Sequence, residues 1–203
     1  MKKFLLIFAV LGIFTSVAIA EGFTLDVDYG MPYVTWTDGE KSYGQKGMGF
    51  VCDYRFIGDT LGFQFTMGVQ LPYNLSITNT STGTTYDRDI QTDTRSWVTS
   101  DFFMGVSFVP VSTNLVDLVI TPGLGASFDV ITDKNDSFTN MNLGVGVDIC
   151  TNVKIIDDIG ITAGLLFEYQ FVSIEDNGTT DVLNKSSVRN YYFLPRAGIS
   201  ISF

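Results

Sequence analysis

The chain has 203 residues, with 22 acidic side chains against 12 basic ones and no histidine. A formal net charge of −10 argues against nucleic-acid binding, which needs a basic surface. Without histidine, Ser-His and Asp-His catalysis and histidine-bound metals are excluded, so we expect no enzymatic activity and no cofactor.

The first twenty residues have the composition of a cleavable signal peptide. Lys2 and Lys3 precede the apolar run 4–15, and Ala18-Ile19-Ala20 forms a small-x-small cleavage site. The alternative is a retained membrane anchor, which the shortness of the apolar run disfavours. We therefore expect a signal peptide at 1–20 and one domain at 21–203, in which 10 basic side chains oppose 22 acidic ones.

Eight segments of the remaining chain alternate between bulky apolar residues and small or polar ones. A period of two is typical of a β-strand with one apolar face. In chain order the segments are Phe23–Trp36, Gly47–Ile57, Leu61–Tyr73, Arg95–Val109, Leu118–Ile131, Met141–Ile149, Ile161–Phe171 and Val188–Phe203.

The lengths of these segments and of their connections predict an all-β, eight-stranded, antiparallel up-and-down barrel that spans a membrane. Most segments have about the ten residues that a tilted strand needs to cross a bilayer. Polar connections, most of them long, follow every odd-numbered segment, as at 37–45, 74–94 and 175–187, and shorter ones follow the even-numbered segments. Pro122 and Pro195 fall in mid-strand, where each removes a hydrogen-bond donor, so we expect bulges there.

The orientation of the barrel follows from the two faces of its strands. A soluble, lipocalin-like barrel would bury the apolar face and expose a polar face rich in Lys and Glu. Here the polar face carries Gly, Ser, Thr and Asp, which suit the crowded interior of an eight-stranded barrel. The Phe, Leu, Ile and Tyr side chains suit lipid. Aromatic residues also gather near the strand ends, as two interfacial girdles would require: Phe23, Phe56, Phe108 and Phe203 at one rim, and Tyr33, Trp36, Tyr73, Trp97 and Tyr191 at the other.

Nine charged residues fall on the predicted inward face and form the candidate site. One interpretation is a salt-bridged network that plugs the lumen, because buried charges need partners. The other is a narrow cation-selective path, because rings of acidic residues favour cations. We favour the plug, since eight strands leave room for little more than side chains. The nine residues are Asp26, Asp28, Asp53, Arg55, Asp101, Asp129, Asp148, Glu168 and Arg196.

With these features the stretch 21–203 resembles the small eight-stranded outer-membrane proteins of the OmpX, OmpW and OmpA-barrel type. Phe203, with Ile201 and Ile199 spaced by twos, resembles the signal read by the outer-membrane assembly machinery. The resemblance implies export to the outer membrane of a Gram-negative-type envelope. The chain departs from OmpA in having no domain after the barrel, and from OmpW in having an acidic rather than an apolar lining.

We therefore expect a structural or surface-interaction protein that contacts outer-membrane lipid and meets partners, including host proteins, through the loops at 74–94 and 175–187. The alternative is a narrow, cation-preferring channel for small solutes.

Overall fold

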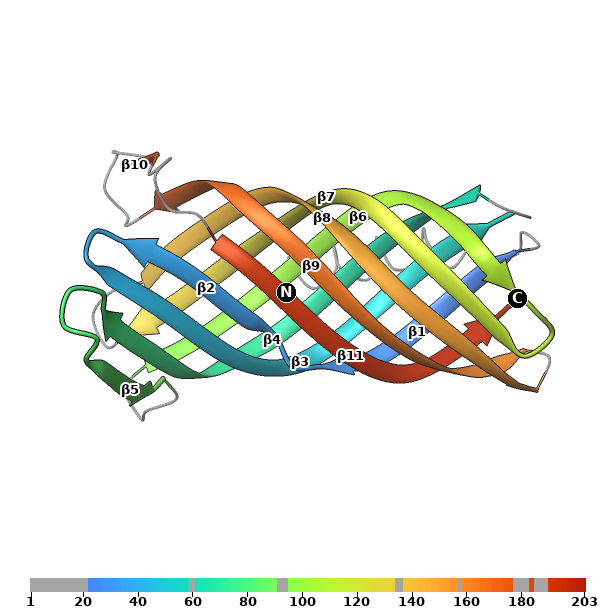
Figure 1. The fold of residues 1–203 in the computed structure, drawn as a ribbon, viewed down its shortest axis with the longest axis horizontal. Helices are drawn as coiled ribbons and strands as arrows, with labels where there is room; N and C mark the ends of the chain where they lie inside the picture. Colours follow the sequence, from blue (N-terminus) through green and yellow to red (C-terminus); the bar gives the residue numbers. More distant parts are fainter. Residues whose placement is uncertain are drawn as a thin grey trace, which may run out of the picture.

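The strands of the chain form a single sheet (Figure 1). The computed structural model describes residues 22–58, 61–90, 95–133, 137–156, 158–176, 183–184 and 190–203, and the predicted signal peptide lies outside these ranges. No helix in the described ranges is long and apolar enough to cross a membrane. The strands are β1 (Phe23–Gly30), β2 (Tyr33–Asp38), β3 (Lys41–Ile57), β4 (Leu61–Asn79), β5 (Thr85–Asp89), β6 (Arg95–Ser112), β7 (Val116–Asp133), β8 (Ser137–Ile156), β9 (Ile159–Asp176), β10 (Leu183–Asn184) and β11 (Asn190–Ser202).

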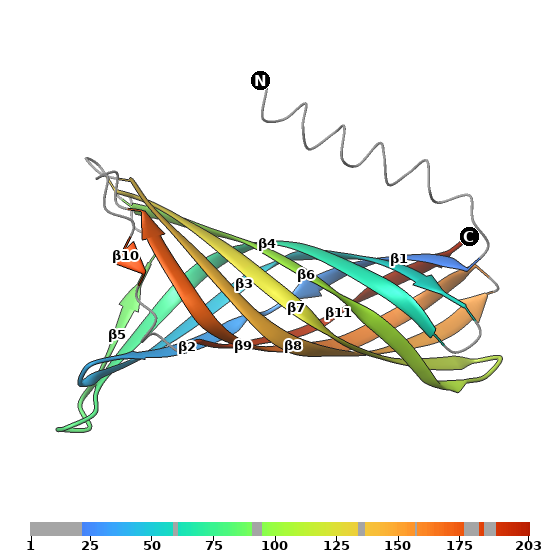
Figure 2. The same ribbon diagram turned by 90° about the horizontal axis from the view of Figure 1, so that it is seen from above.

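Antiparallel pairing carries the sheet around a common axis. The pairs run from β1 to β3, β4, β6, β7, β8, β9 and β11, and β11 pairs with β1 again. The short strands β5 and β10 are added at the edges of β4 and β9. Two views show the strands tilted around an elongated barrel, with the C-terminus at one end and β5 and β10 at the other (Figures 1 and 2). The prediction of an all-β, antiparallel up-and-down barrel is confirmed.

The first predicted segment is divided into β1 and β2 at Met31 and Pro32. Met31 N donates to Pro195 O, and Gly47 N donates to Pro32 O, each at 3.0 Å. In an antiparallel pair the reciprocal donors would be the nitrogens of Pro195 and Pro32, which carry no hydrogen. Two prolines on neighbouring strands therefore interrupt the ladder at one level.

The expectation of bulges at Pro122 and Pro195 is wrong. The β7–β8 register passes through Pro122 unbroken, and the β9–β11 register passes through Pro195. Pro122 acts on its other neighbour: the β6–β7 ladder has no pair between Gly105–Gly123 and Phe108–Ile120. The register shifts lie instead between Lys46 and Gly47, Phe108 and Val111, Leu143 and Gly144, and Lys154 and Ile156.

Three of the predicted polar connections, 37–45, 74–94 and 175–187, are partly strand. β3 already begins at Lys41, β4 runs on to Asn79, and β5 pairs with the end of β4. The expectation of a loop over 74–94 is therefore wrong for 74–79 and 85–89. Most of these residues are polar, so their composition resembles that of a loop although their cross-strand register is regular.

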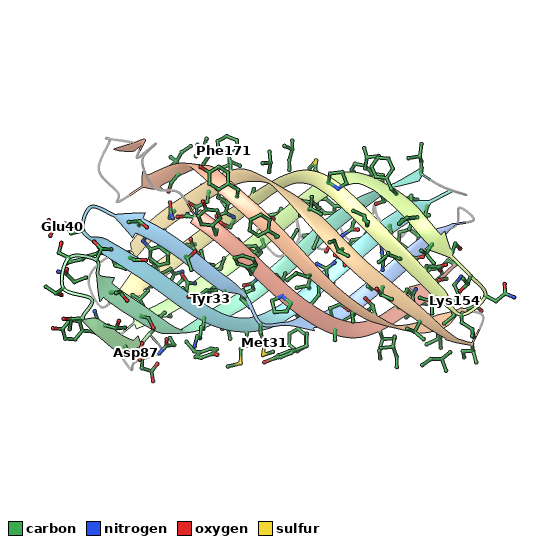
Figure 3. All side chains as sticks on the ribbon, viewed as in Figure 1. Met31, Tyr33, Glu40, Asp87, Lys154 and Phe171 are labelled. Atoms are coloured by element: carbon green, nitrogen blue, oxygen red, sulfur yellow. The ribbon has the colours of Figure 1, made fainter. Side chains whose placement is uncertain are left out.

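Large apolar side chains cover the outside of the barrel. Phe50, Leu124, Ile161 and Ile199 are exposed there, and Met31 and Phe171 point away from the ribbon in Figure 3. The predicted girdle includes two errors. Trp97 donates to Asp129 in the lumen, at 3.0 Å, and Trp36 lies on the same face of β2 as the inward Val34. The outward apolar face and the closed ladder suit a bilayer, where every backbone group needs a partner.

Candidate functional site: the barrel lumen

All nine charged residues predicted to face inward are at most 8% exposed. They come from seven strands, β1, β3, β6, β7, β8, β9 and β11, because each of these places alternate residues toward the axis. The structure divides them into two groups, one at the end of the barrel that holds the C-terminus and one toward the opposite end.

The first group, here called the arginine network, joins Arg55 and Arg196 to four aspartates. Arg55 forms an ion pair with Asp26. Arg196 reaches three carboxylates: its Nε lies 3.0 Å from Asp28 Oδ2, and its Nη2 lies 2.5 Å from Asp53 Oδ2 and 2.7 Å from Asp148 Oδ2. Four acids thus face two guanidinium groups, and these contacts tie β1, β3, β8 and β11 together across the lumen.

Neutral side chains extend this network toward β4 and β7. Gln64 Nε2 donates to Asp148 Oδ2 at 2.5 Å and to Thr66 at 3.0 Å. Thr121 donates to Gln64 Oε1 at 3.0 Å and also contacts Ser107, 2.8 Å away. The Ser107–Thr121 contact links β6 and β7 at the level where Pro122 removes their ladder pairs.

The second group, here called the acidic network, contains Asp101, Asp129 and Glu168, and no Lys or Arg side chain contacts it among the described residues. Thr99 donates to Asp129 Oδ1 at 2.6 Å. Gln170 donates to Glu168 Oε2 at 3.0 Å. Further donors are neutral: Gln70 to Asp101, Asn142 to Asp129 and to Ser127, and Asn190 to Asn142.

An apolar layer separates the two networks. It consists of Val51, Phe103, Leu166 and Leu194, which are at most 1% exposed and pack together with the ring of Tyr192. Along β6 the inward order is Asp101, Phe103, Gly105, Ser107, and along β11 it is Tyr192, Leu194, Arg196. Each strand therefore passes from one polar network through the apolar layer to the other.

Glycines on the intervening strands make room for these side chains. A Cβ at Gly30 of β1 would lie 2.6 Å from Leu194 Cδ1. A Cβ at Gly125 of β7 would overlap the carboxyl group of Glu168, which extends across from β9. The lumen is therefore filled by alternation of large and small residues around the barrel, as the narrow interior of eight strands requires.

The end of the barrel nearest the C-terminus opens into a cavity of about 1080 Å³. Its lining includes Arg55, Asn152 and Lys154, and Lys154 is visible at this end in Figure 3. Asp26, Asp28 and Asp53 could offer carboxylate oxygens within 4.8 Å of one another to a cation. The two guanidinium groups already face these oxygens, so we treat them as an ion-paired cluster.

Sequence reasoning missed the apolar layer. Alternation places Val51, Leu194 and Tyr192 on the polar face, but only the charged residues of that face were assigned to the candidate site. Phe103 and Leu166, which share the parity of Asp101 and Glu168, complete the layer. The sequence does contain a signal for this layer: on each of four strands, one bulky apolar residue occurs among the glycines and polar residues that face inward.

The three residues of the predicted assembly signal lie on the outer face, where Phe203 is 59% exposed and Ile201 and Ile199 are also exposed. Phe203 packs against Phe23, with ring centroids 5.6 Å apart. Of the two predicted interaction loops, 74–94 contains strand as described above, and most of 175–187 lies outside the described residues.

No protein-family model and no curated protein sequence matches the chain. Solved structures do match. Neisserial surface protein A (NspA) has a TM-score of 0.62 and 12% identity, over 90% of this chain and 98% of that one. OprG from Pseudomonas aeruginosa has a TM-score of 0.57 and 8% identity, over 90% and 96%. A major outer membrane protein from Thermus thermophilus has a TM-score of 0.50 and 14% identity, over 87% and 99%.

These likenesses extend over nearly the whole of each neighbour and concern the fold. Together with the exposed apolar face and the polar lumen, they show that the chain has the fold of the small outer-membrane β-barrel proteins.

Proposed function

We propose that the protein is a non-enzymatic outer-membrane barrel with a structural or surface-interaction role, and that its lumen is closed. The observation that carries this proposal is the apolar layer, whose four side chains come from β3, β6, β9 and β11 and are buried between the two polar networks. A dry constriction blocks ions because an ion crossing it must lose water without gaining a polar partner.

A cation-preferring channel is the second candidate. Seven inward acids against two arginines favour cations over anions. Such a path would have to pass the apolar layer, where Phe103 and Leu194 offer no oxygen to a cation.

Planar-bilayer recording of the refolded protein tests the closed lumen. We expect no steady current steps at either polarity of the applied voltage. A heat-denatured sample serves as the control for leakage caused by detergent or by the lipid. Reproducible cation-selective steps from the folded barrel would overturn the closed lumen and favour the channel.

We also propose that Phe203, with Ile201 and Ile199, is read by the outer-membrane assembly machinery. Phe203→Ser should lower the amount of folded barrel recovered from outer membranes several-fold. Val153→Ser is the matched control, because it also replaces an exposed apolar side chain by serine on the outer face at the same end of the barrel. Equal recovery of the two variants would contradict the proposal.

A further inference from the structure

Four strands continue past the barrel wall and form an extension on one side of the end opposite the C-terminus (Figures 1 and 2). It consists of β2, the beginning of β3, the end of β4, and β5. Figure 3 shows Glu40 and Asp87 in this region, far from Lys154 at the other end. The regular pairing across all four strands makes the extension an ordered sheet.

In this extension the side toward the barrel axis is apolar and the outer side is polar, which is the reverse of the barrel wall. Val34 packs against the apolar layer and Gln45 is buried, so residues two positions along from them also face the axis. The cross-strand partners Trp36, Tyr43, Ile77 and Tyr86 therefore form a row on the axis side, here called the aromatic row. The outer side carries Thr37, Ser42, Thr78 and Thr85 in the corresponding row.

The aromatic row is ordered but only partly covered. Trp36 and Tyr43 stack with ring centroids 5.0 Å apart and planes inclined by 4°. Tyr86, at the other end of the row, is 66% exposed. With strands about 4.8 Å apart, the four residues span roughly 14 Å. The row lies on the axis side, away from the outer face that suits lipid, so a partly exposed apolar strip of this length indicates a contact surface.

The residue types of the row and the charges beside it indicate the kind of partner. Trp, Tyr and Arg are the residues that dominate binding energy at protein interfaces. Arg88 follows Tyr86 on the same side of β5 and is exposed. Lys41 precedes Tyr43 on the same side of β3 and lies opposite Asp38 in the β2–β3 register. Lys41 therefore already has an acidic cross-strand neighbour, and Arg88 is the cation that remains for a partner.

We propose that the aromatic row, flanked by Arg88, is the docking surface for a protein segment that presents apolar side chains beside carboxylates. This inference rests on the surface-interaction role proposed above and gives that role a position and a partner chemistry. Apolar side chains of the partner would pack on the rings, and a carboxylate would pair with Arg88. This cation would speed association with acidic segments and disfavour basic ones.

The test uses Trp36 as its own reporter. The chain has two tryptophans, so Trp97→Phe leaves Trp36 as the single emitter, and heat-modifiability on gels verifies that the barrel is folded. Two synthetic peptides without tryptophan serve as probes. Both carry Leu at alternate positions, and the residues between are Glu in one peptide and Lys in the other. We expect the Glu peptide to shift Trp36 emission to shorter wavelength and to bind at least tenfold more tightly than the Lys peptide.

Matched variants on β5 locate the site. Tyr86→Ala and Arg88→Glu, on the axis side, should each weaken binding of the Glu peptide at least tenfold. Thr85→Ala and Asp87→Asn, on the outer side of the same strand, should leave binding unchanged. Equal binding of the two peptides, no binding to the folded barrel, or equal losses in all four variants would overturn the proposal.

Acrylamide quenching of the free protein tests whether the chain covers the row itself. Protected Trp36 emission would overturn the docking surface, whereas accessible emission is expected. Failure of this inference and failure of the proposed function are distinguishable. A silent barrel that binds neither peptide rejects only the docking surface, whereas cation-selective current rejects the closed lumen whatever the peptides do.

Discussion

At the scale of single residues, Arg196 is the centre of the arginine network. Its guanidinium group contacts Asp28, Asp53 and Asp148, all of them buried. Arg196→Ala would leave three buried carboxylates without their cation. Breaking a buried ion pair in this way lowers the free energy of unfolding by about 3–5 kcal/mol. We expect a correspondingly lower urea midpoint for the refolded barrel, and Arg55→Ala should act in the same direction through Asp26.

Lys154→Ala is the matched control for this prediction. Lys154 Nζ lies 2.8 Å from Asp117 Oδ2 at the barrel end, and both side chains are partly exposed. A pair of this kind contributes about 1 kcal/mol or less. Similar urea midpoints and unchanged heat-modifiability for Arg196→Ala and Lys154→Ala would show that the arginine network does not hold the strands together.

Inward glycines provide a second prediction at this scale. A Cβ at Gly198 would overlap Val27 O and lie 2.5 Å from Asp28 Oδ1, whereas a Cβ at Gly68 would have its nearest neighbour, Asp101 Oδ2, at 3.5 Å. Overpacking of this kind costs about 1–3 kcal/mol. Gly198→Ala should therefore lower the free energy of unfolding by that amount, and Gly68→Ala should leave it nearly unchanged. Equal effects in urea unfolding would contradict the packing argument.

At the scale of the strands, Pro122 leaves a local gap in the β6–β7 ladder without changing the register. Pro122→Val would supply the missing N–H and a branched side chain suited to a strand. One added backbone hydrogen bond stabilises by about 1 kcal/mol, so the urea midpoint should rise. Leu124→Val, a change on the same face of β7 that adds no donor, is the control. A midpoint that does not rise above that control would indicate that the gap has another cause.

The strands also show what sequence periodicity can and cannot predict. The period of two was enough to locate the eight wall segments and to place the nine charged residues on one face, because alternation is a property of one strand alone. The aromatic row was missed because Trp36, Tyr43, Ile77 and Tyr86 become neighbours only through the pairing of four strands. The effect of Pro195 also depends on its neighbour, since the interruption it causes appears between β1 and β2.

At the scale of the whole molecule, the apolar face is on the outer side in the barrel wall and on the axis side in the extension. Through the wall the outer face is apolar and the lumen polar, except at the apolar layer of Val51, Phe103, Leu166 and Leu194. In the extension the axis side is apolar and the outer side polar. The first arrangement suits a bilayer, and the second suits water outside it with a partner on the axis side. The wall and the extension of one chain therefore present their apolar faces in opposite directions.

The apolar layer carries the last prediction. Phe103→Ala with Leu194→Ala removes most of its volume between two polar networks, so water should enter the space that is left. We expect the double variant to show small current steps in planar bilayers where the wild-type barrel shows none. Leu124→Ala with Ile199→Ala, two exposed residues of the outer face, should remain silent. Gel heat-modifiability verifies folding of both proteins. A folded double variant that stays silent would mean that the two polar networks close the lumen without the apolar layer.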